Sequence, residues 1–218
     1  MPAMADPDSR AGSRYATGPI LDWCARVHVH HDDALTRAFA TPEGVPAIMV
    51  GPSEGQLLGL LCRLGRVARA VEIGTLVGYS AIHIGRALAP GGHLWSIEFD
   101  AGHAAFARDN LAAAGLAERV TVVEGAGVDV LPTLEGHGPF DAVFIDADKI
   151  NYDRYGAWAV THLRPGGLVL GDNAFLFGEL LEDTERGRAM RGFHELVAKS
   201  CDSVCIPTPD GLVLGIKR

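Results

Sequence analysis

The chain has 218 residues, of which 19 are Lys or Arg and 27 are Asp or Glu, so its formal net charge is −8. Apolar residues make up 48% and charged residues 21%, which is typical of a globular protein and excludes a collagen, a coiled coil or a wholly disordered chain. The acidic balance disfavours non-specific nucleic-acid binding, because that binding depends on Lys and Arg neutralising phosphates.

The cysteine content and the hydropathy point to a reduced, aqueous compartment. Four cysteines are too few for a disulfide framework in a chain of this length. No apolar run reaches the ~18 residues that suggest a membrane span, and nothing near the N-terminus resembles a signal peptide. We therefore expect a cytoplasmic protein with no membrane association.

The N-terminal part predicts a tail followed by helices. Residues 1–18 are rich in Ala, Gly, Ser and Asp without periodicity, so we expect a flexible tail, and residues 19–218 form a single domain. Residues 19–40 predict one or two short helices. Ser53 and Gln56 have the spacing of a capping box, and leucines follow at one face of a predicted helix over 57–64.

From residue 69 onward, short apolar runs alternate five times with helical stretches, which predicts a parallel sheet covered by helices on both faces. Two final runs are separated by a turn too short for a crossover helix, so the sheet should end in an antiparallel hairpin. The expected fold class is α/β, with a doubly wound, mostly parallel, seven-stranded Rossmann-like sheet. The expected strands are 70–73, 93–99, 120–123, 140–145, 167–170, 203–206 and 212–216, and the helices between them are 80–89, 101–114, 128–134, 152–163 and 184–200.

Open parallel sheets bind ligands beyond the carboxyl ends of their strands, so the residues that follow each strand are site candidates. After the first strand, Gly74 and Gly78 allow a tight turn and a close backbone approach. Glu98 ends the second strand, where a carboxylate can accept from two ribose hydroxyls. Small residues around Ala126 leave room for a flat base. The glycines could also form a plain strand-to-helix turn, and Glu98 could be a helix cap, a role that Asp100 could fill instead. The glycine turn and Glu98 together nevertheless favour an adenosine-type ligand.

The fourth and fifth strands end in polar residues that suit a metal. Asp146 follows the fourth strand, and Asp172 and Asn173 follow the fifth. Two carboxylates and an amide oxygen are hard ligands for Mg²⁺, Mn²⁺ or Ca²⁺, although caps and salt bridges use the same residue types. Lys149 is near enough in sequence to reach the same cleft. A lysine beside a dication has its pKa lowered and is a candidate base, whereas a solvated lysine or an ion pair with Asp148 is the plainer interpretation.

These residues give the chain a resemblance to the cation-dependent class I O-methyltransferases, the group that contains catechol and caffeoyl-CoA O-methyltransferases. The resemblance covers roughly residues 48–217 and rests on four segments in order, namely 50–56, 71–80, 140–149 and 164–173. It implies S-adenosylmethionine as the methyl donor. The positions that match the donor site in the family are Val50, Glu72, Gly74, Thr75, Gly78, Tyr79, Ser80, Glu98, Phe99, Ala126 and Asp146.

The resemblance also implies a metal-assisted reaction. Asp146, Asp172 and Asn173 match the three metal ligands, with Mg²⁺ as the first expectation and Mn²⁺ or Ca²⁺ as alternatives, and Lys149 matches the proposed base. Asp146 and Lys149 are thus the expected catalytic residues. The expected reaction is methylation of one hydroxyl on a small catechol-like or vicinal-oxygen acceptor. The expected assembly is a homodimer, and neither nucleic acid nor membrane is an expected partner.

Three alternatives remain open from the sequence. Some relatives methylate tRNA at the wobble uridine, and Arg186, Arg188, Arg191 and Lys199 offer a local basic patch for that purpose, against the net charge. A nicotinamide-dependent oxidoreductase is disfavoured because G-x-G-x-x-G is missing. A silent donor-binding module has no physical need for Asp146, Asp172 and Asn173. The histidines at 28, 30 and 31 are best explained by an exposed helix start with Asp caps, and a second metal site or a wall of the acceptor pocket are the other interpretations.

Overall fold

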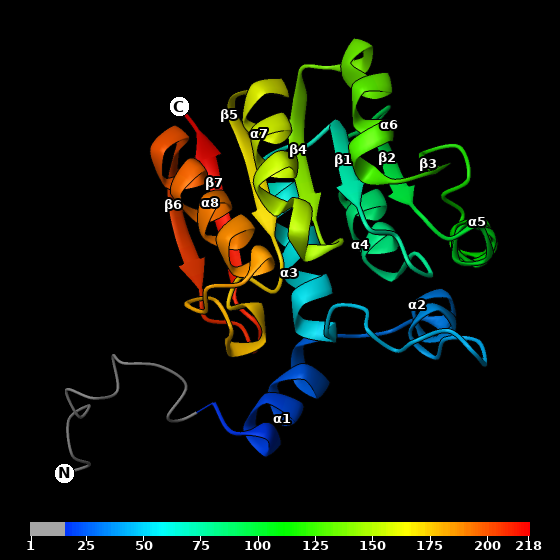
Figure 1. Ribbon diagram of the computed structural model, residues 1–218. Helices are drawn as coiled ribbons and strands as arrows, with labels where there is room; N and C mark the ends of the chain where they lie inside the picture. The colour runs from blue at the N-terminus through cyan, green and yellow to red at the C-terminus, as the bar shows by residue number, and fades with distance from the viewer. Residues whose placement is uncertain (1–15) are drawn as a thin grey trace.

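Seven strands form one sheet in the computed structural model, which describes residues 16–218 (Figure 1). The strand order is β3-β2-β1-β4-β5-β7-β6, and the pairs from β3 to β5 are parallel, whereas β7 runs antiparallel to both β5 and β6. This confirms the predicted fold class and its terminal hairpin. The strands are β1 (Arg69–Ile73), β2 (His93–Glu98), β3 (Val120–Glu124), β4 (Phe140–Ile145), β5 (Leu163–Gly171), β6 (Cys201–Ile206) and β7 (Leu212–Lys217).

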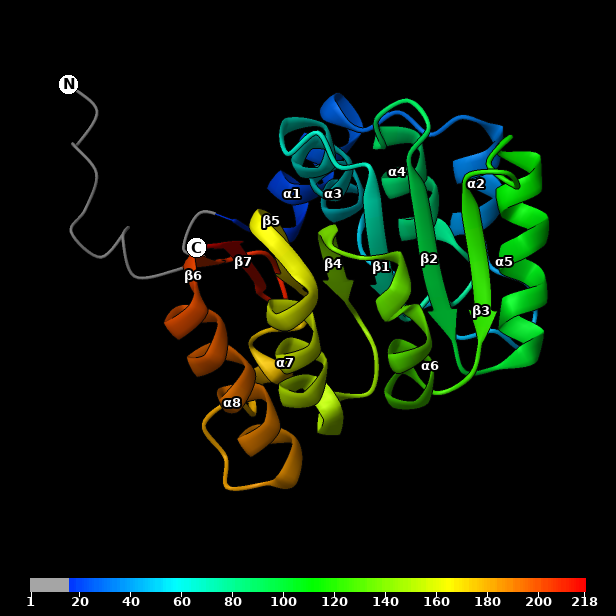
Figure 2. The same ribbon diagram turned by 90° about the horizontal axis from the view of Figure 1, so that it is seen from above.

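The helices cover both faces of the sheet, as Figure 2 shows, with α6, α7 and α8 on one face and α3 and α4 on the other. Each face has its own apolar core, one built around Leu58, Ile82 and Leu111 and the other around Phe140 and Phe193. The helices are α1 (Gly18–His28), α2 (Asp33–Phe39), α3 (Pro52–Leu64), α4 (Tyr79–Ala87), α5 (Ala101–Ala113), α6 (Gly127–Leu134), α7 (Tyr152–His162) and α8 (Glu185–Ser200), with short 3-10 turns η2 (Glu135–His137), η3 (Lys149–Asn151) and η4 (Leu176–Gly178).

Residues 19–40 form the two short helices that the pattern predicts, and Asp32 caps the second by accepting from the Leu35 amide at 3.0 Å. An Asp-capped helix start is the interpretation that the sequence analysis preferred for the segment with histidines 28, 30 and 31. Residues 1–15 of the expected tail lie outside the described residues, and α1 already begins at Gly18. None of the helices within residues 16–218 is long and apolar enough to cross a bilayer.

The predicted boundaries lie within two residues of the observed ones except at the start of β5, and the cap of α3 also differs from the prediction. Helix α3 begins at Pro52 rather than after Ser53, because Gly51 is the N-cap and the Glu54 carboxylate accepts from the Gly51 amide at 3.3 Å. Strand β5 begins at Leu163 rather than at residue 167, because Leu163 pairs with Phe140 before a register shift in the β4–β5 ladder. The first difference arises from a side-chain cap and the second from strand pairing, and residue composition reveals neither.

The strand order reverses between β1 and β4, which lie side by side but connect onward in opposite directions along the sheet. A crevice opens at such a switch point because the two following loops diverge. The Asp146 amide donates to the Ile73 carbonyl at 2.8 Å, so the ends of β1 and β4 meet there. The fold therefore places the candidate site at the carboxyl ends of these two strands.

Candidate active site

A cavity of about 870 Å³ lies along the carboxyl ends of β1, β2, β3 and β4. Most of the residues predicted from the sequence line it, and they come from six separate segments of the chain. The three predicted residues that do not line it are Glu72, Gly78 and Asp172. Those that do are Val50, Gly74, Thr75, Tyr79, Ser80, Glu98, Phe99, Ala126, Asp146, Lys149 and Asn173.

Gly74 closes the floor of the cavity where β1 ends. Its φ is +101°, and a Cβ on this residue would lie 1.9 Å from the Asp146 carbonyl oxygen, so only glycine fits. Gly78 has a different place, because it is the left-handed N-cap of α4 and packs against the backbone of Ala107 on α5. Gly74 therefore shapes the cavity, whereas Gly78 joins two helices behind it.

Glu98 is held at the end of β2 by backbone amides. One carboxylate oxygen accepts from the amides of Thr75 at 3.2 Å and Leu76 at 2.7 Å, and the other accepts from the Asp100 amide at 2.9 Å. Asp100 itself caps α5 through the His103 amide. The capping role thus belongs to Asp100, which leaves Glu98 facing the cavity with spare lone pairs for a ligand's hydroxyls.

Glu72 lies beneath the cavity floor and is fully buried. Ser96 donates to one of its oxygens at 2.5 Å, and Thr75 hydrogen-bonds Ser96 at 2.5 Å, so Glu72 acts on the turn through two hydroxyls. The other oxygen of Glu72 has no hydrogen-bond partner among the described residues. Burial in this setting raises the pKa of Glu72 to about 7.

This raised pKa gives a test of how Glu72 is buried. An acid with a higher pKa in the folded than in the unfolded state makes folding less favourable as pH rises through the interval between the two values. From the carboxyl's usual 4.5 to about 7, this costs about 3 kcal/mol of unfolding free energy. We expect urea unfolding at pH 5 and pH 8 to show a smaller pH-dependent loss in E72Q than in the wild type, and no such difference in the exposed control E118Q. Equal pH dependence in E72Q and wild type would contradict the assignment.

Asp146 and Lys149 form an ion pair at the end of β4. The Lys149 Nζ lies 3.0 Å from Asp146 Oδ1 and 3.0 Å from the Tyr152 hydroxyl. The pairing with Asp148 that the sequence left open is not what the structure shows, since Asp148 accepts from the Tyr155 hydroxyl and from Asn151. The lysine therefore points to the residue that the sequence placed among the metal ligands.

Asp172 follows β5 and is 3% exposed, and its Oδ1 has no hydrogen-bond partner among residues 16–218. Burial raises the pKa of this carboxyl, and the nearby charges of Asp146 and Glu54 raise it further. A buried, unpartnered carboxylate oxygen beside a second carboxylate is a costly arrangement for a protein alone. It fits a divalent cation that would neutralise both.

Asn173 supplies the third oxygen of the trio. It lines the cavity directly after Asp172, with a left-handed φ of +52°. Within the described residues no group of three or more His, Cys, Asp or Glu side chains is arranged to hold a metal, so a site here needs the Asn173 amide. Two carboxylates and an amide suit Mg²⁺ or Mn²⁺ rather than a softer metal.

Comparison with known proteins shows the family to which the chain belongs. The sequence profile of the O-methyltransferase family matches residues 30–218. The chain belongs to this O-methyltransferase family. A catechol O-methyltransferase of Niastella koreensis is 42% identical over 193 residues, which cover 87% of each chain. A catechol O-methyltransferase of Mycobacterium tuberculosis is 42% identical over 164 residues, or 74% of each chain.

Solved structures agree with this membership. The O-methyltransferase of Bacillus cereus in complex with SAH superposes with a TM-score of 0.86 at 32% identity, covering 92% of this chain and 97% of that one. The O-methyltransferase TomG of Streptomyces achromogenes, in complex with SAM, gives a TM-score of 0.84 at 34% identity, covering 98% and 99%. Family membership leaves no support for the nicotinamide-dependent oxidoreductase.

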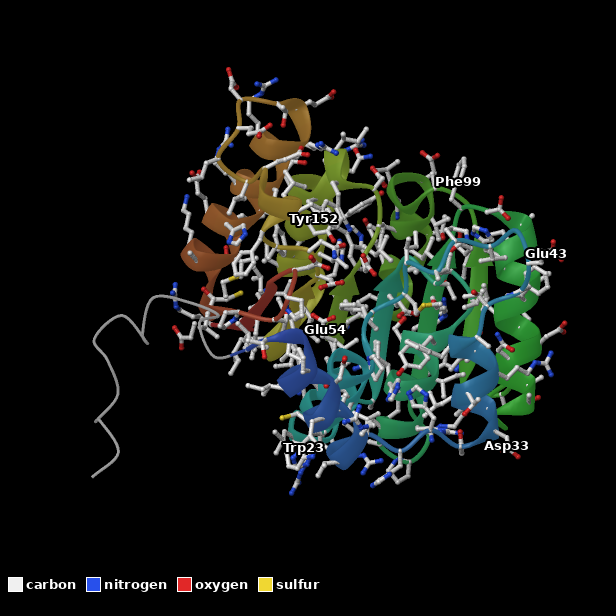
Figure 3. The ribbon with its side chains drawn as sticks, turned by 90° about the horizontal axis from the view of Figure 1, so that it is seen from below. Trp23, Asp33, Glu43, Glu54, Phe99 and Tyr152 are labelled. Carbon is white, nitrogen blue, oxygen red and sulfur yellow. The ribbon has the colours of Figure 1, made fainter. Side chains whose placement is uncertain are left out.

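Sequence reasoning missed several residues of this O-methyltransferase's site. Residues 46–49 line the cavity together with Val50, and His103 lies 3.7 Å from a Glu98 oxygen. Glu54 lies close enough to Asp172 for its charge to raise the pKa of the Asp172 carboxyl. Figure 3 shows Glu54 and Tyr152 in the central region of the molecule, and Phe99 beyond the end of β2. His31 belongs to the histidine segment that the sequence analysis noted, and it shares a 2.8 Å hydrogen bond with the Tyr79 hydroxyl. Residues 46–49 went unnoticed because they follow no predicted strand and precede the matching segment at 50–56.

Proposed function

We propose that this O-methyltransferase transfers a methyl group from S-adenosylmethionine to one hydroxyl of a small aromatic acceptor with vicinal oxygens, using a divalent cation. The observation that carries the proposal is the buried, unpartnered oxygen of Asp172 beside Asp146, with Lys149 in contact with Asp146. Two relatives that are 42% identical bear the name catechol O-methyltransferase, and two similar solved structures hold SAH and SAM.

The cavity has room for the donor along its whole length. We propose that Glu98 accepts from the ribose hydroxyls of the donor, and that the adenine ring lies between Phe99 and the small residues at 125–127. The methionine end would then lie against Thr75, Ser80 and the Val50 segment. S-adenosylmethionine supplies an electrophilic methyl group on a sulfonium sulfur. The protein's contribution is to hold that methyl group in line with the attacking oxygen, for which positioning is worth up to ~7–11 kcal/mol.

The acceptor's oxygens belong at the Asp146 end of the cavity. Asp146, Asp172 and Asn173 would hold the cation, and a cation there would lower the pKa of an adjacent acceptor hydroxyl. The charge of the cation would favour loss of the Lys149 proton to solvent, and the resulting amine would take the proton from that hydroxyl onto Nζ. The oxygen's electron pair forms the new O–C bond, the C–S bond breaks toward sulfur, and the donor leaves as a neutral thioether. Lys149 later releases its proton to solvent.

The charges of the cavity bear on the choice of acceptor. Four carboxylates line it, those of Glu98, Asp146, Asp148 and Asp210, and Lys149 and His103 are its cationic or ionisable basic side chains. Near the Asp146 end, the apolar side chains of Ile48, Ile150 and Phe177 are exposed and line the same cavity. This surface favours a flat, apolar ring without negative charge over a coenzyme A thioester.

The function is tested by methyl transfer to three catechols that differ in one substituent. We expect 4-methylcatechol and dopamine to be methylated with a kcat/KM about fivefold or more above that of 3,4-dihydroxyphenylacetic acid, since a like charge at a cavity wall costs ~1 kcal/mol or more. Product formation is followed by mass spectrometry, with resorcinol as the control that lacks vicinal oxygens. Equal methylation of resorcinol, or no methylation of any catechol, would contradict the proposal.

The tRNA alternative has less support in the structure. Arg186 pairs with Glu179, Arg188 pairs with Asp183, and Arg191 donates to the carbonyls of Leu180 and Glu182. These arginines on α8 are therefore engaged with acidic side chains and backbone oxygens rather than presented as a patch. Binding of tRNA with a steep salt dependence would favour the alternative.

The homodimer stays a proposal. Helix α1 buries none of its residues within the described chain, and it exposes the apolar side chains of Ile20, Leu21, Trp23 and Val27. Figure 3 shows Trp23 at the outer side of this helix. Light scattering of the purified protein gives the oligomeric state directly, and a monomer at micromolar concentration would contradict the homodimer.

A further inference from the structure

Tyr152 is the first residue of α7 and is fully buried directly below the Asp146–Lys149 pair. Its ring packs edge-on against Phe193, with ring centroids 5.5 Å apart and planes at 89°. Lys149 Nζ lies 4.8 Å from the centre of the Tyr152 ring. A buried aromatic ring whose hydroxyl contacts Lys149 is a different feature from the metal ligands and the proposed base.

The Tyr152 hydroxyl has three close neighbours. The Ile145 carbonyl at the end of β4 lies at 3.1 Å, the Asp172 carbonyl after β5 lies at 2.9 Å, and Lys149 Nζ lies at 3.0 Å. A phenol has one proton to donate, and both carbonyls are acceptors only. The proton therefore goes to the carbonyls, and a lone pair of the hydroxyl is left to accept from Lys149.

The second partner of Lys149 is Asp146 Oδ1 at 3.0 Å, which is also an acceptor. The Lys149 nitrogen has three tetrahedral directions besides its bond to Cε. When Asp146 and Tyr152 accept N–H bonds in two of them, only the third is left for the acceptor hydroxyl. Lys149 lines the cavity in which the acceptor would lie.

We propose that Tyr152 is a positioning residue that orients the amine of Lys149 for proton removal from the acceptor hydroxyl. The inference rests on the proposed function, in which the acceptor O–H bond breaks and its proton forms the third N–H bond of Lys149. Tyr152 ties this orientation to the ends of β4 and β5, the two strands that also carry Asp146 and Asp172. Removing the hydroxyl leaves the amine free to rotate about its side chain.

Kinetics of Y152F, K149A and the double variant test the proposal. We expect Y152F to lower kcat by about 10- to 100-fold, the size of effect that misplacing a reacting group has, with KM for the acceptor and Kd for the donor within twofold of wild type. In the K149A background, Y152F should lower kcat no further, because the orientation of an absent amine cannot matter. T161V, which removes a hydroxyl of the same helix that bonds only the Ala157 carbonyl, is the control and should match wild type.

The outcomes separate three cases. An equal loss of kcat from Y152F in both backgrounds would assign Tyr152 a structural role and overturn the inference, as would wild-type kcat in Y152F. If the wild type methylates no acceptor, the proposed function fails, and the hydrogen bond itself is still tested by a measurement that needs no catalysis.

That measurement is nitrogen-15 NMR of the lysine side chains. The sequence has three lysines, Lys149, Lys199 and Lys217, so three signals are expected and K149A assigns one of them. Lys149 should show slow proton exchange and restricted rotation in the wild type. Y152F should accelerate both for Lys149 alone, leaving Lys199 and Lys217 unchanged. A Lys149 signal that already exchanges as fast as Lys199 in the wild type would overturn the inference, even if Y152F does not fold.

Discussion

Asp146→Asn is expected to lower kcat/KM by about 10³-fold or more, because several kcal/mol of transition-state stabilisation by a cation depend on its anionic ligands. The substitution also removes the ion pair with Lys149, whose Nζ lies 3.0 Å from Asp146 Oδ1. Calorimetry with Mg²⁺ and Mn²⁺ should show lost binding in parallel with lost activity. Thorough chelation of the wild type should have the same effect, and restoring Mg²⁺ should reverse it.

Asp172→Asn should separate activity from stability. The Asp172 carboxyl is buried with one unpartnered oxygen, and burial and the charges of Asp146 and Glu54 raise its pKa. The neutral amide relieves that repulsion, so metal-free D172N should unfold at a higher urea concentration than the metal-free wild type while losing methyl transfer. D153N is the matched control, because Asp153 is exposed and accepts only from the neighbouring Arg154 amide. Full activity after chelation, or lower stability of D172N than of the wild type, would contradict the cation site.

Lys149→Ala is expected to lower kcat by about 10²- to 10³-fold, the range that a positioned general base contributes. Donor affinity should stay within a few-fold of wild type, because the proposed donor contacts, Glu98 above all, lie at the other end of the cavity. Calorimetry with S-adenosylhomocysteine measures that affinity, and K199A on α8 serves as the control for a lysine outside the cavity. Loss of donor binding with kcat unchanged would show that Lys149 belongs to the donor site and is not the base.

The sequence located the predicted metal ligands better than it located Glu72 of the predicted donor site. Asp146, Asp172 and Asn173 follow apolar runs directly, and strand ends in a parallel sheet meet at one edge, so sequence order alone placed them together. Glu72 precedes a glycine turn in the same way, yet it points below the floor and reaches the turn through Ser96 and Thr75. The alternation of side chains along a strand decides between these two faces, and an ambiguity of one residue reverses it.

Local hydrogen bonds were harder to anticipate than strands. Lys149 has carboxylates three residues and one residue before it, and the structure pairs it with Asp146, while Asp148 bonds Tyr155 and Asn151. Tyr152 carried no signal at all, because a buried tyrosine is ordinary core unless its hydroxyl has identified partners. The cap of α3 was also hard to anticipate, since the sequence favoured Ser53 as the N-cap and the structure has Gly51 with Glu54.

The order of strands and helices, the antiparallel end of the sheet and the residues that follow each strand could all be predicted from the sequence. These features depend on hydrophobic periodicity and turn chemistry, which are local properties of the chain. The partner of each polar side chain, the side chains that reach the cavity and the segments that line it from elsewhere, such as residues 46–50, became evident only from the folded structure. Those outcomes depend on contacts between residues far apart in the chain, and hydrophobic periodicity reports only local structure.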